Sequence, residues 1–373
     1  MNCKLILAKA RVFALFVAST LNASATTPVQ ASVQLTFQIA ADDYYLSPSW
    51  SSNGAKLALL GWNGTVALID VVNQRLSHRF KIRPPVAQVL ISPDASKLAA
   101  YDSRNLRIYS TQTGQEIARV AAPRDCIFYA NRSGGAVWTD DANIAVACAI
   151  AKVPLPNDEL VRALNVITYS LPGLAITRET HVDPNPDSVS SPDIYIRNSN
   201  SGVIVLRSFE LKRQTASSPR QFGIECTVLS SRVQCFPSVK LRRGVYYPLR
   251  LVAVNREVTK VAVAVSEQFE GSAEAVIHVY YPLSRSQMTM LPPSTLLSSD
   301  PLASSAMSTH GDLIAASYLG SESSGTSGWL LWNSSGALLH AAYGQRVQEI
   351  SFSPDDTGLV AVGKDAIRFY QID

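Results

Sequence analysis

The side chains that most often perform catalysis or bind metals are few in this sequence and lie far apart along it. Its histidines are His78, His181, His278, His310 and His340. None belongs to an H-E-x-x-H pattern, in which two histidines on one helix face bind zinc. The sequence also has no G-x-S-x-G turn for a serine nucleophile and no glycine loop for a phosphate. These absences favour a non-enzymatic function.

One short segment places oxygen ligands at alternate positions, as calcium-binding loops do. Asp183, Asn185 and Asp187 are separated by two prolines. A calcium loop would continue with a glycine and close with a glutamate, but Ser188 and Ile194 occupy those positions. We therefore expect a solvated linker here, with no metal and no cofactor.

Four cysteines follow the N-terminal segment, and their pattern suits disulfide bonds. In "CTVLSSRVQC" a two-residue turn at Ser230–Ser231 would place Cys226 opposite Cys235. Counted outward from such a turn, this is a non-hydrogen-bonded pair, whose side chains approach most closely. A pair of reduced thiols is the alternative. Cys126 and Cys148 are predicted to pair by elimination.

The first 25 residues have the features of a cleaved export signal. Three basic residues precede the apolar run Val12–Leu21, and Ala23–Ala25 supplies the small residues that signal peptidase requires. The run is too short to span a bilayer. We expect a mature chain that begins near Thr26, is periplasmic or secreted, and has no integral membrane span; an uncleaved N-terminal anchor is the alternative.

The charge balance argues against nucleic acid as a partner. The chain has 33 basic and 29 acidic residues, and the signal contains three basic and no acidic ones, which leaves 30 against 29. Phosphate neutralisation needs a surplus of Lys and Arg on the binding face.

A ten-residue pattern recurs along the rest of the chain. "ISPDASKLAA" from Ile91 and "FSPDDTGLVA" from Phe352 are nearly identical. Each copy joins the end of one strand to a polar turn and then to a run of β-branched and small apolar residues, which predicts a hairpin. A third and a fourth strand follow in most units, for example "LRIYS" and "EIARVA". The remaining copies begin at Trp50, Trp138, Arg197, Val254 and Met307.

Repetition of four strands at intervals of 41 to 59 residues is typical of sheets arranged radially. The chain resembles the β-propeller superfamily, in particular WD-repeat-like and TolB-type propellers. The resemblance is carried by Ser92-Pro93-Asp94, Ser353-Pro354-Asp355 and the segment that begins at Ser47, and it covers essentially the whole mature chain. The Gly-His dipeptide of true WD repeats is absent, and only Ile69-Asp70 keeps the aspartate of their Trp-Asp ending.

The chain ends predict how the ring closes. After Phe352 the sequence has room for two more strands only, whereas Ser32–Ile39 is an unassigned alternating segment before the first unit. Pairing the two would remove an exposed sheet edge. We therefore predict an all-β, seven-bladed propeller with four-stranded antiparallel blades, formed by residues 26–373 as one domain and closed by the N-terminal strand.

Long connections between second and third strands, and between consecutive units, should emerge on one face over blades 3 to 6. Loops on a rigid scaffold often carry recognition, although insertions also accumulate there by drift. The long connections begin at Pro123, Lys152, Asp183, Leu211, Glu267, Pro292 and Gly320. Candidate binding residues in them are Asp158, Glu159, Lys212, Arg213, Arg220, Glu267 and Glu270.

The same sector of the sequence is basic. Between Ser190 and Arg250 the acidic residues are Asp193, Glu210 and Glu225. Such a surplus can attract an acidic partner, but alternation along strands sends side chains to different faces, which favours an ordinary solvated surface. The basic residues are Arg197, Arg207, Lys212, Arg213, Arg220, Arg232, Lys240, Arg242, Arg243 and Arg250.

Two functions remain open. The favoured one is an exported, monomeric, non-enzymatic propeller that binds another protein or an envelope component through the loop-bearing face. The alternative is a propeller-type small-molecule enzyme, such as a lactonase-like hydrolase, which needs His, Asp or Glu side chains that meet at the central channel.

Overall fold

The computed structural model describes residues 32–129, 134–154, 159–182, 188–190, 194–211, 222–240, 250–269, 272–283, 286–290, 302–320 and 327–373. The chain divides into two units, Met1–Gln30 and Ala31–Asp373, and the described residues all belong to the second. The export signal therefore lies outside the described residues and stays a prediction, as does the domain boundary at residue 26. In the described part of the chain, no helix is long and apolar enough to cross a membrane.

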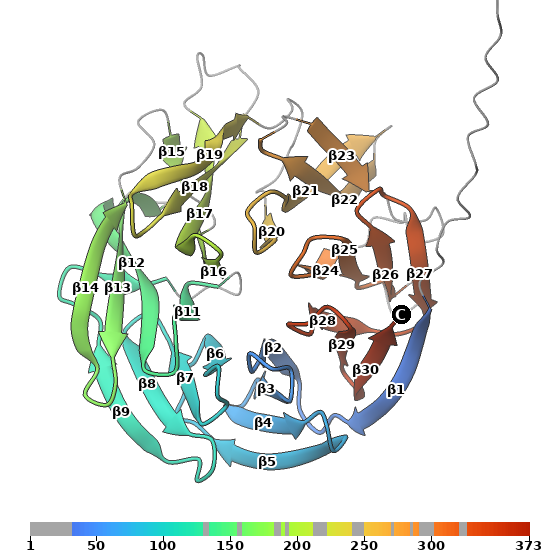
Figure 1. Ribbon diagram of the computed structural model, residues 1–373, viewed down its shortest axis with the longest axis horizontal. Helices are drawn as coiled ribbons and strands as arrows, with labels where there is room; N and C mark the ends of the chain where they lie inside the picture. Colours follow the sequence, from blue (N-terminus) through green and yellow to red (C-terminus); the bar gives the residue numbers. More distant parts are fainter. Residues whose placement is uncertain are drawn as a thin grey trace, which may run out of the picture. The chain divides into compact units, whose positions relative to one another are not determined.

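The regular elements of the described residues are β-strands, which form seven antiparallel sheets arranged in a ring (Figure 1). We number the sheets 1 to 7 in chain order. Sheet 1 contains β2 (Tyr45–Trp50), β3 (Lys56–Gly61), β4 (Thr65–Asp70) and β5 (Arg75–Lys81), and sheet 2 contains β6 (Gln88–Ile91), β7 (Lys97–Tyr101), β8 (Asn105–Ser110) and β9 (Glu116–Ala121).

In sheets 3 and 4 the innermost strand is divided into two pieces that both pair with the second strand. Sheet 3 contains β10 (Ile127–Phe128), β11 (Ala136–Trp138), β12 (Asn143–Pro154), β13 (Glu159–Ser170) and β14 (Ala175–Val182). Sheet 4 contains β15 (Ser188–Ser190), β16 (Ile194–Ser199), β17 (Gly202–Leu211), β18 (Phe222–Val228) and β19 (Val233–Lys240).

The remaining sheets again have four strands each. Sheet 5 contains β20 (Arg250–Val254), β21 (Val261–Phe269), β22 (Ser272–Tyr281) and β23 (Ser286–Met290). Sheet 6 contains β24 (Leu302–Met307), β25 (Leu313–Tyr318), β26 (Gly328–Asn333) and β27 (Leu338–Tyr343), and sheet 7 contains β28 (Val347–Phe352), β29 (Gly358–Gly363), β30 (Ala366–Ile372) and β1 (Val33–Ala40).

Apolar residues on both faces of each sheet pack against the neighbouring sheets. In β7, Leu98 and Ala100 face sheet 1, whereas Ala99 and Tyr101 face sheet 3. Successive strand residues point to opposite faces, so a strand buried on both sides needs an unbroken apolar run. This is why the second strand of each repeat is the most apolar part of the sequence pattern.

The two ends of the described chain lie side by side in sheet 7. Strand β1 pairs antiparallel with β30, with Phe37 opposite Phe369 and Ile39 opposite Ile367. The rings of Phe37 and Phe369 stack with their centroids 4.1 Å apart. Sheet 7 also packs on sheet 1, where Val360 and Val362 of β29 belong to the same buried cluster as residues of β3.

Two connections that the sequence suggests are loops continue as strand. β12 and β13 remain paired as far as Pro154 and Glu159, and β21 and β22 as far as Phe269 and Ser272. The expectation of long loops from Lys152 and Glu267 was therefore wrong for most of their length. Small and β-branched residues alternate in the inner parts of β12 and β21, and the pairing continues beyond them to the ends of both hairpins.

The predicted cysteine pairs are both present, Cys126 with Cys148 and Cys226 with Cys235, with Cα atoms 5.5 and 5.2 Å apart. The predicted pairs Val228–Val233 and Thr227–Gln234 are present, but the predicted cross-strand partner of Cys226 was wrong. The turn spans Leu229–Arg232, and a bulge places Cys226 opposite Phe236. Arg232 takes the left-handed conformation, with φ of 55°, and its N–H donates to the carbonyl of Val228, which closes a longer turn than two residues allow.

Candidate axial site

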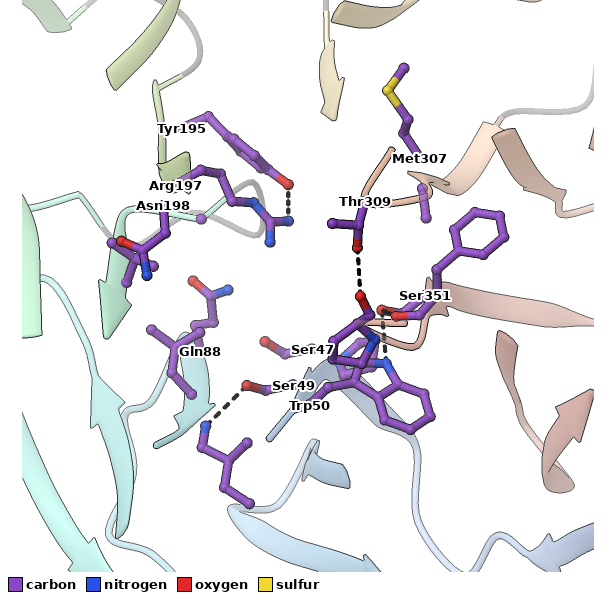
Figure 2. Close-up of a pocket in the computed structure, with 18 of the residues that line it drawn as sticks. Ser47, Ser49, Trp50, Gln88, Tyr195, Arg197, Asn198, Met307, Thr309 and Ser351 are labelled. Atoms are coloured by element: carbon purple, nitrogen blue, oxygen red, sulfur yellow. Dashed lines mark hydrogen bonds between the residues drawn. The ribbon is translucent and has the colours of Figure 1, made fainter. Parts of the chain in front are cut away.

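The innermost strands of the sheets surround a cavity of about 470 Å3 at the centre of the ring (Figure 2). Its lining runs from the first residues of these strands to the turns that follow them. Small hydroxyl and amide side chains alternate with apolar ones around it. The polar members include Ser47, Ser49, Gln88, Asn198, Thr309 and Ser351.

Irregularities in the inner strands direct side chains into the cavity. Register shifts interrupt the pairing of β2 between Leu46 and Ser49, and of β28 between Val347 and Glu349. A bulge turns the strand locally and re-aims its side chains, and bulges are common near functional sites. Ser47, on the cavity wall, has φ of 55°, a conformation rare for a residue with a side chain.

Two arginines from consecutive sheets reach the cavity. Arg197 of β16 is exposed, its guanidinium carbon lies 4.5 Å from the ring centroid of Tyr195, and it donates a hydrogen bond to the Tyr195 hydroxyl. Arg256, in the turn after β20, also lines the cavity and is exposed. Figure 2 shows Arg197 and Tyr195 on one wall, with Thr309 and Ser351 on the other side.

Glu349 is the one carboxylate among the described lining residues, and no histidine is present among them. It accepts a hydrogen bond from Ser304 Oγ at 3.0 Å, and Ser304 Oγ in turn accepts one from the N–H of Ile350 at 3.2 Å. The hydrolase alternative predicts several His, Asp or Glu side chains together at the channel. Within the described ranges, no group of three His, Cys, Asp or Glu residues could hold a metal ion.

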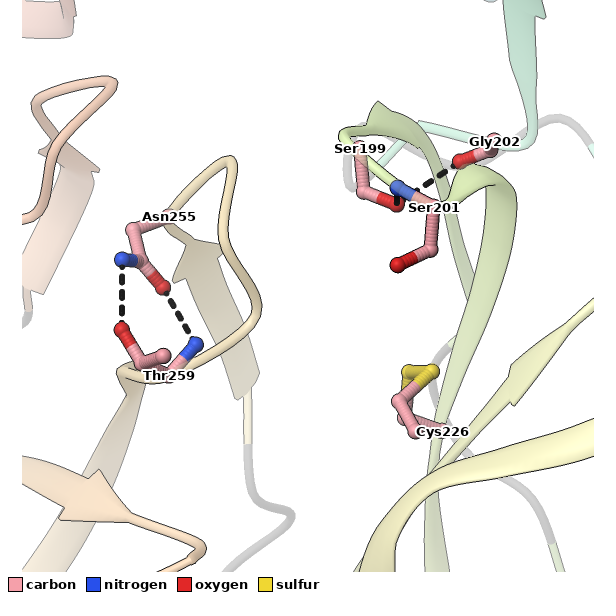
Figure 3. Close-up of a disulfide and its surroundings, with 7 residues drawn as sticks. Ser199, Ser201, Gly202, Cys226, Asn255 and Thr259 are labelled. Atoms are coloured by element: carbon pink, nitrogen blue, oxygen red, sulfur yellow. Dashed lines mark hydrogen bonds between the residues drawn. A yellow bond between two sulfur atoms is a disulfide. The ribbon is translucent and has the colours of Figure 1, made fainter.

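The turns between first and second strands form a ring of short polar turns at one end of the cavity, which we call the turn collar. Buried Ser92 donates to Asp94 Oδ1 at 2.6 Å and accepts the N–H of Lys97 at 2.9 Å. Asn255 closes its turn in a similar way. Its Oδ1 accepts the N–H of Thr259, and its Nδ2 donates to Thr259 Oγ1 (Figure 3). The recurring Ser-Pro-Asp phrase is thus a turn closed by its own side chains.

Hydrogen bonds join neighbouring sheets at or beside the collar. Because all but one of the bonds use a backbone group of an inner strand or its turn, they fix the inner strands relative to one another. The bonds are Ser52 N–H to Pro93 O, Asp94 N–H to Asp141 Oδ1, Asn198 Nδ2 to Trp138 O, Asn200 N–H to Arg256 O, Arg256 N–H to Thr309 O, Thr309 Oγ1 to Pro354 O and Trp50 Nε1 to Ser351 Oγ.

Comparison with known proteins supports the architecture. No family model and no curated protein matches the sequence. Among solved structures, the β-propeller domain of Cps50 (Swd1) from Myceliophteria thermophila superimposes with a TM-score of 0.59 at 14% sequence identity, over 92% of this chain and 100% of that domain. The chain folds as a β-propeller. Its blades are four-stranded antiparallel sheets, as the sequence predicts.

The candidate binding residues of the propeller remain predictions. Glu159 and Glu267 lie in the paired ends of β13 and β21, opposite Pro154 and Glu274. The other candidates lie outside the described residues, as does the calcium-like segment Asp183–Asp187. The candidates outside the described residues are Asp158, Lys212, Arg213, Arg220 and Glu270.

The basic sector does not form one patch among its described side chains. Arg197 points to the cavity, whereas Arg207 is buried and forms an ion pair with Glu225 on the neighbouring strand. Arg232 is exposed in the turn between β18 and β19. The three described arginines thus lie on different elements and in different surroundings.

Arg197 was not singled out as a cavity residue from the sequence, although the repeats contain the necessary signal. When the repeats are aligned on their turns, the residue two positions before the first turn residue lies on the inner strand, and the cavity lining includes this residue from six repeats. In six of the seven repeats it is neutral, and in the fourth it is Arg197. The residues in chain order are Ser49, Leu90, Val137, Arg197, Ala253, Ala306 and Ser351.

Proposed function

We propose that this chain is an exported, monomeric, non-enzymatic propeller that binds another protein or an envelope component. Recognition takes place on the face that carries the connections between second and third strands, over sheets 3 to 6. Propellers of the WD-repeat type, which the sequence resembles, serve as protein-interaction domains, and this likeness supports the class of function.

The observation that carries the proposal is the length of the hairpins on that side. Strands β12 and β13 have 12 residues each, whereas β3 and β4 of sheet 1 have six. Because a strand rises about 3.4 Å per residue, the longer hairpin extends well beyond the part of the sheet that packs on its neighbours. A rigid projection of this kind presents side chains with little entropy cost on binding.

We further propose that each of the seven sheets is one blade of a closed ring. The pairing of β1 with β30 and the buried cluster shared by sheets 7 and 1 support this proposal. The pairing covers the edge that β30 would otherwise expose, and a closed ring keeps the projecting hairpins in a fixed arrangement.

Site-specific photo-crosslinking in the native envelope tests the recognition face. A photoreactive residue at Glu159 or Glu267 should give a discrete adduct with a partner, whereas the same residue at Gln112, in the turn between β8 and β9, should give none. Equal labelling from Gln112, or no adduct from either hairpin, would contradict the proposal.

Mass spectrometry of the exported protein should find Thr26 as its first residue.

A further inference from the structure

We infer that the axial cavity is a binding site for a small ligand that carries a carboxylate, held by Arg197 with help from Arg256. This site is separate from the loop-bearing face, because its lining includes Ser52, Pro93 and Thr309 of the turn collar. The two arginines come from adjacent sheets, whose turns are joined by the hydrogen bond from Asn200 N–H to Arg256 O.

Neither guanidinium has a carboxylate partner within the described residues. Arg197 binds the hydroxyl of Tyr195, which is neutral, and the described part of the chain gives the Arg256 side chain no hydrogen bond or ion pair. A guanidinium has five N–H donors in a planar fork that matches a carboxylate. Most donors of both side chains therefore remain available to a ligand.

The acidic side chains of the collar are engaged elsewhere. Asp94 accepts bonds from Ser92 and Ser96, Asp312 pairs with Lys260 at 2.8 Å, and Asp356 pairs with His310 at 2.8 Å. On the cavity wall, Glu349 accepts a bond from Ser304. No other carboxylate among the described residues completes the arginine pair, so we assign that role to a ligand.

The cavity also fits a small ligand in size and surface. Its volume of about 470 Å3 lies within the range of roughly 300–1,000 Å3 found for small-molecule pockets. The packing of Arg197 on the Tyr195 ring restricts the guanidinium before the ligand arrives, which lowers the entropy cost of binding. The hydroxyl and amide groups of Ser47, Ser49 and Gln88 can bind polar groups of the same ligand.

A carboxylate of this size has two sources, the C-terminus of a peptide and a free organic acid, and the probes distinguish them. Trp50 and Trp138 line the cavity, so ligand entry should change intrinsic fluorescence. The full-length mature protein is titrated with Ala-Ala-Ala, its C-terminal amide, galacturonate and galactose. We expect a saturable change with one or both acids and none with the two neutral analogues.

The matched variants are Arg197→Gln, Arg256→Gln and, as a control in the same sheet as Arg197, the exposed Arg232→Gln. Arg197→Gln should weaken acid binding about tenfold, the loss typical of one hydrogen bond to a charged group; Arg256→Gln should weaken it less and Arg232→Gln should not change it. All three should unfold at the same temperature as the parent. Absence of any response to either acid at millimolar concentration, equal binding of the neutral analogues, or equal binding by the Arg197 and Arg232 variants would overturn the inference.

Discussion

The propeller has two unlike arcs. In sheets 6, 7, 1 and 2, the regular arc, the second strands β25, β29, β3 and β7 have five or six residues. In sheets 3, 4 and 5, the elaborated arc, the second strands β12, β17 and β21 have 12, 10 and nine residues. Five or six residues are enough to pack one sheet on the next, so the extra length in the elaborated arc serves something other than ring packing.

Other features divide along the same line. Both disulfides lie in the elaborated arc, one in sheet 3 and one in sheet 4, and the inner strands of these two sheets are divided into two pieces. The regular arc contains both copies of the Ser-Pro-Asp turn. The comparison indicates that the regular arc is held by packing and turn hydrogen bonds, and that the elaborated arc depends in addition on covalent cross-links.

The largest expected effect comes from removing those cross-links. The double change Cys126→Ala and Cys148→Ala should lower the free energy of unfolding by about 3 kcal/mol, because the bond closes a loop with a sequence separation of 22 residues. Changing Cys226 and Cys235 to Ala should cost slightly less, since their separation is nine residues.

Urea unfolding measures both differences, and hydrogen exchange shows where the loss lies. Faster exchange should be confined to sheets 3 and 4 under native conditions. Equal acceleration in β3 and β7 of the regular arc would remove the distinction between the arcs.

A smaller effect is expected in the regular arc from Asp70→Asn. Asp70 is buried and accepts bonds from Lys56 Nζ at 2.6 Å and from Asn73, and these bonds hold the pKa of its carboxyl well below its usual range. The variant should lose about 2 kcal/mol of stability at neutral pH, the value typical of hydrogen bonds to a charged group.

The stability difference between the parent and Asp70→Asn should depend on pH. A carboxyl with a depressed pKa stabilises the fold above its unfolded pKa of about 3.9, and the gain is lost as the pH falls toward the folded value. Unfolding curves of the parent and of Asp70→Asn should therefore converge as the pH falls below about 4. A constant difference down to pH 2 would show that the charge of Asp70 is not the cause.

The smallest effect is expected at the collar. His310 is exposed, and the hydrogen bond from its ring to Asp356 and the charge of Asp356 raise its pKa. The protonated form is favoured in the folded state, so the stabilisation is present below the unfolded pKa and is lost as the pH rises through the folded one. His310→Gln should lower the melting temperature slightly at pH 5.5 and leave it unchanged at pH 8.5; an equal decrease at both values would contradict the assignment.

Much of the fold could be predicted because the residues that close each turn lie within the same repeat. Ser92 and Ser353 are buried, and each serine binds a backbone N–H five residues later, so turn position and strand register follow from local sequence. The pairing of Val33–Ala40 with β30 followed from counting strands, since one sheet lacked an outer strand and one alternating segment lacked a partner.

Other features depended on geometry that no single repeat contains. A bulge between Cys226 and Thr227 shifted the register at the cysteine pair, although no residue there carries a signal for a bulge. The prolines around Pro154 indicate a loop, yet β12 continues to that residue because β13 supplies a partner. Arg197 became a site residue only when seven separate strands were brought around one axis.

The closed ring is tested most directly by joining its two ends. Val33 and Ile372 face each other across β1 and β30, next to the pair Ser32 and Asp373, which exchange both backbone hydrogen bonds. Val33 and Ile372 therefore form a non-hydrogen-bonded pair, whose side chains are close enough for a disulfide. In the double variant Val33→Cys and Ile372→Cys, mass spectrometry after thiol alkylation should find the two new cysteines joined without reductant, and the melting temperature should rise. Two alkylated, unpaired cysteines in a folded protein would contradict the closed ring.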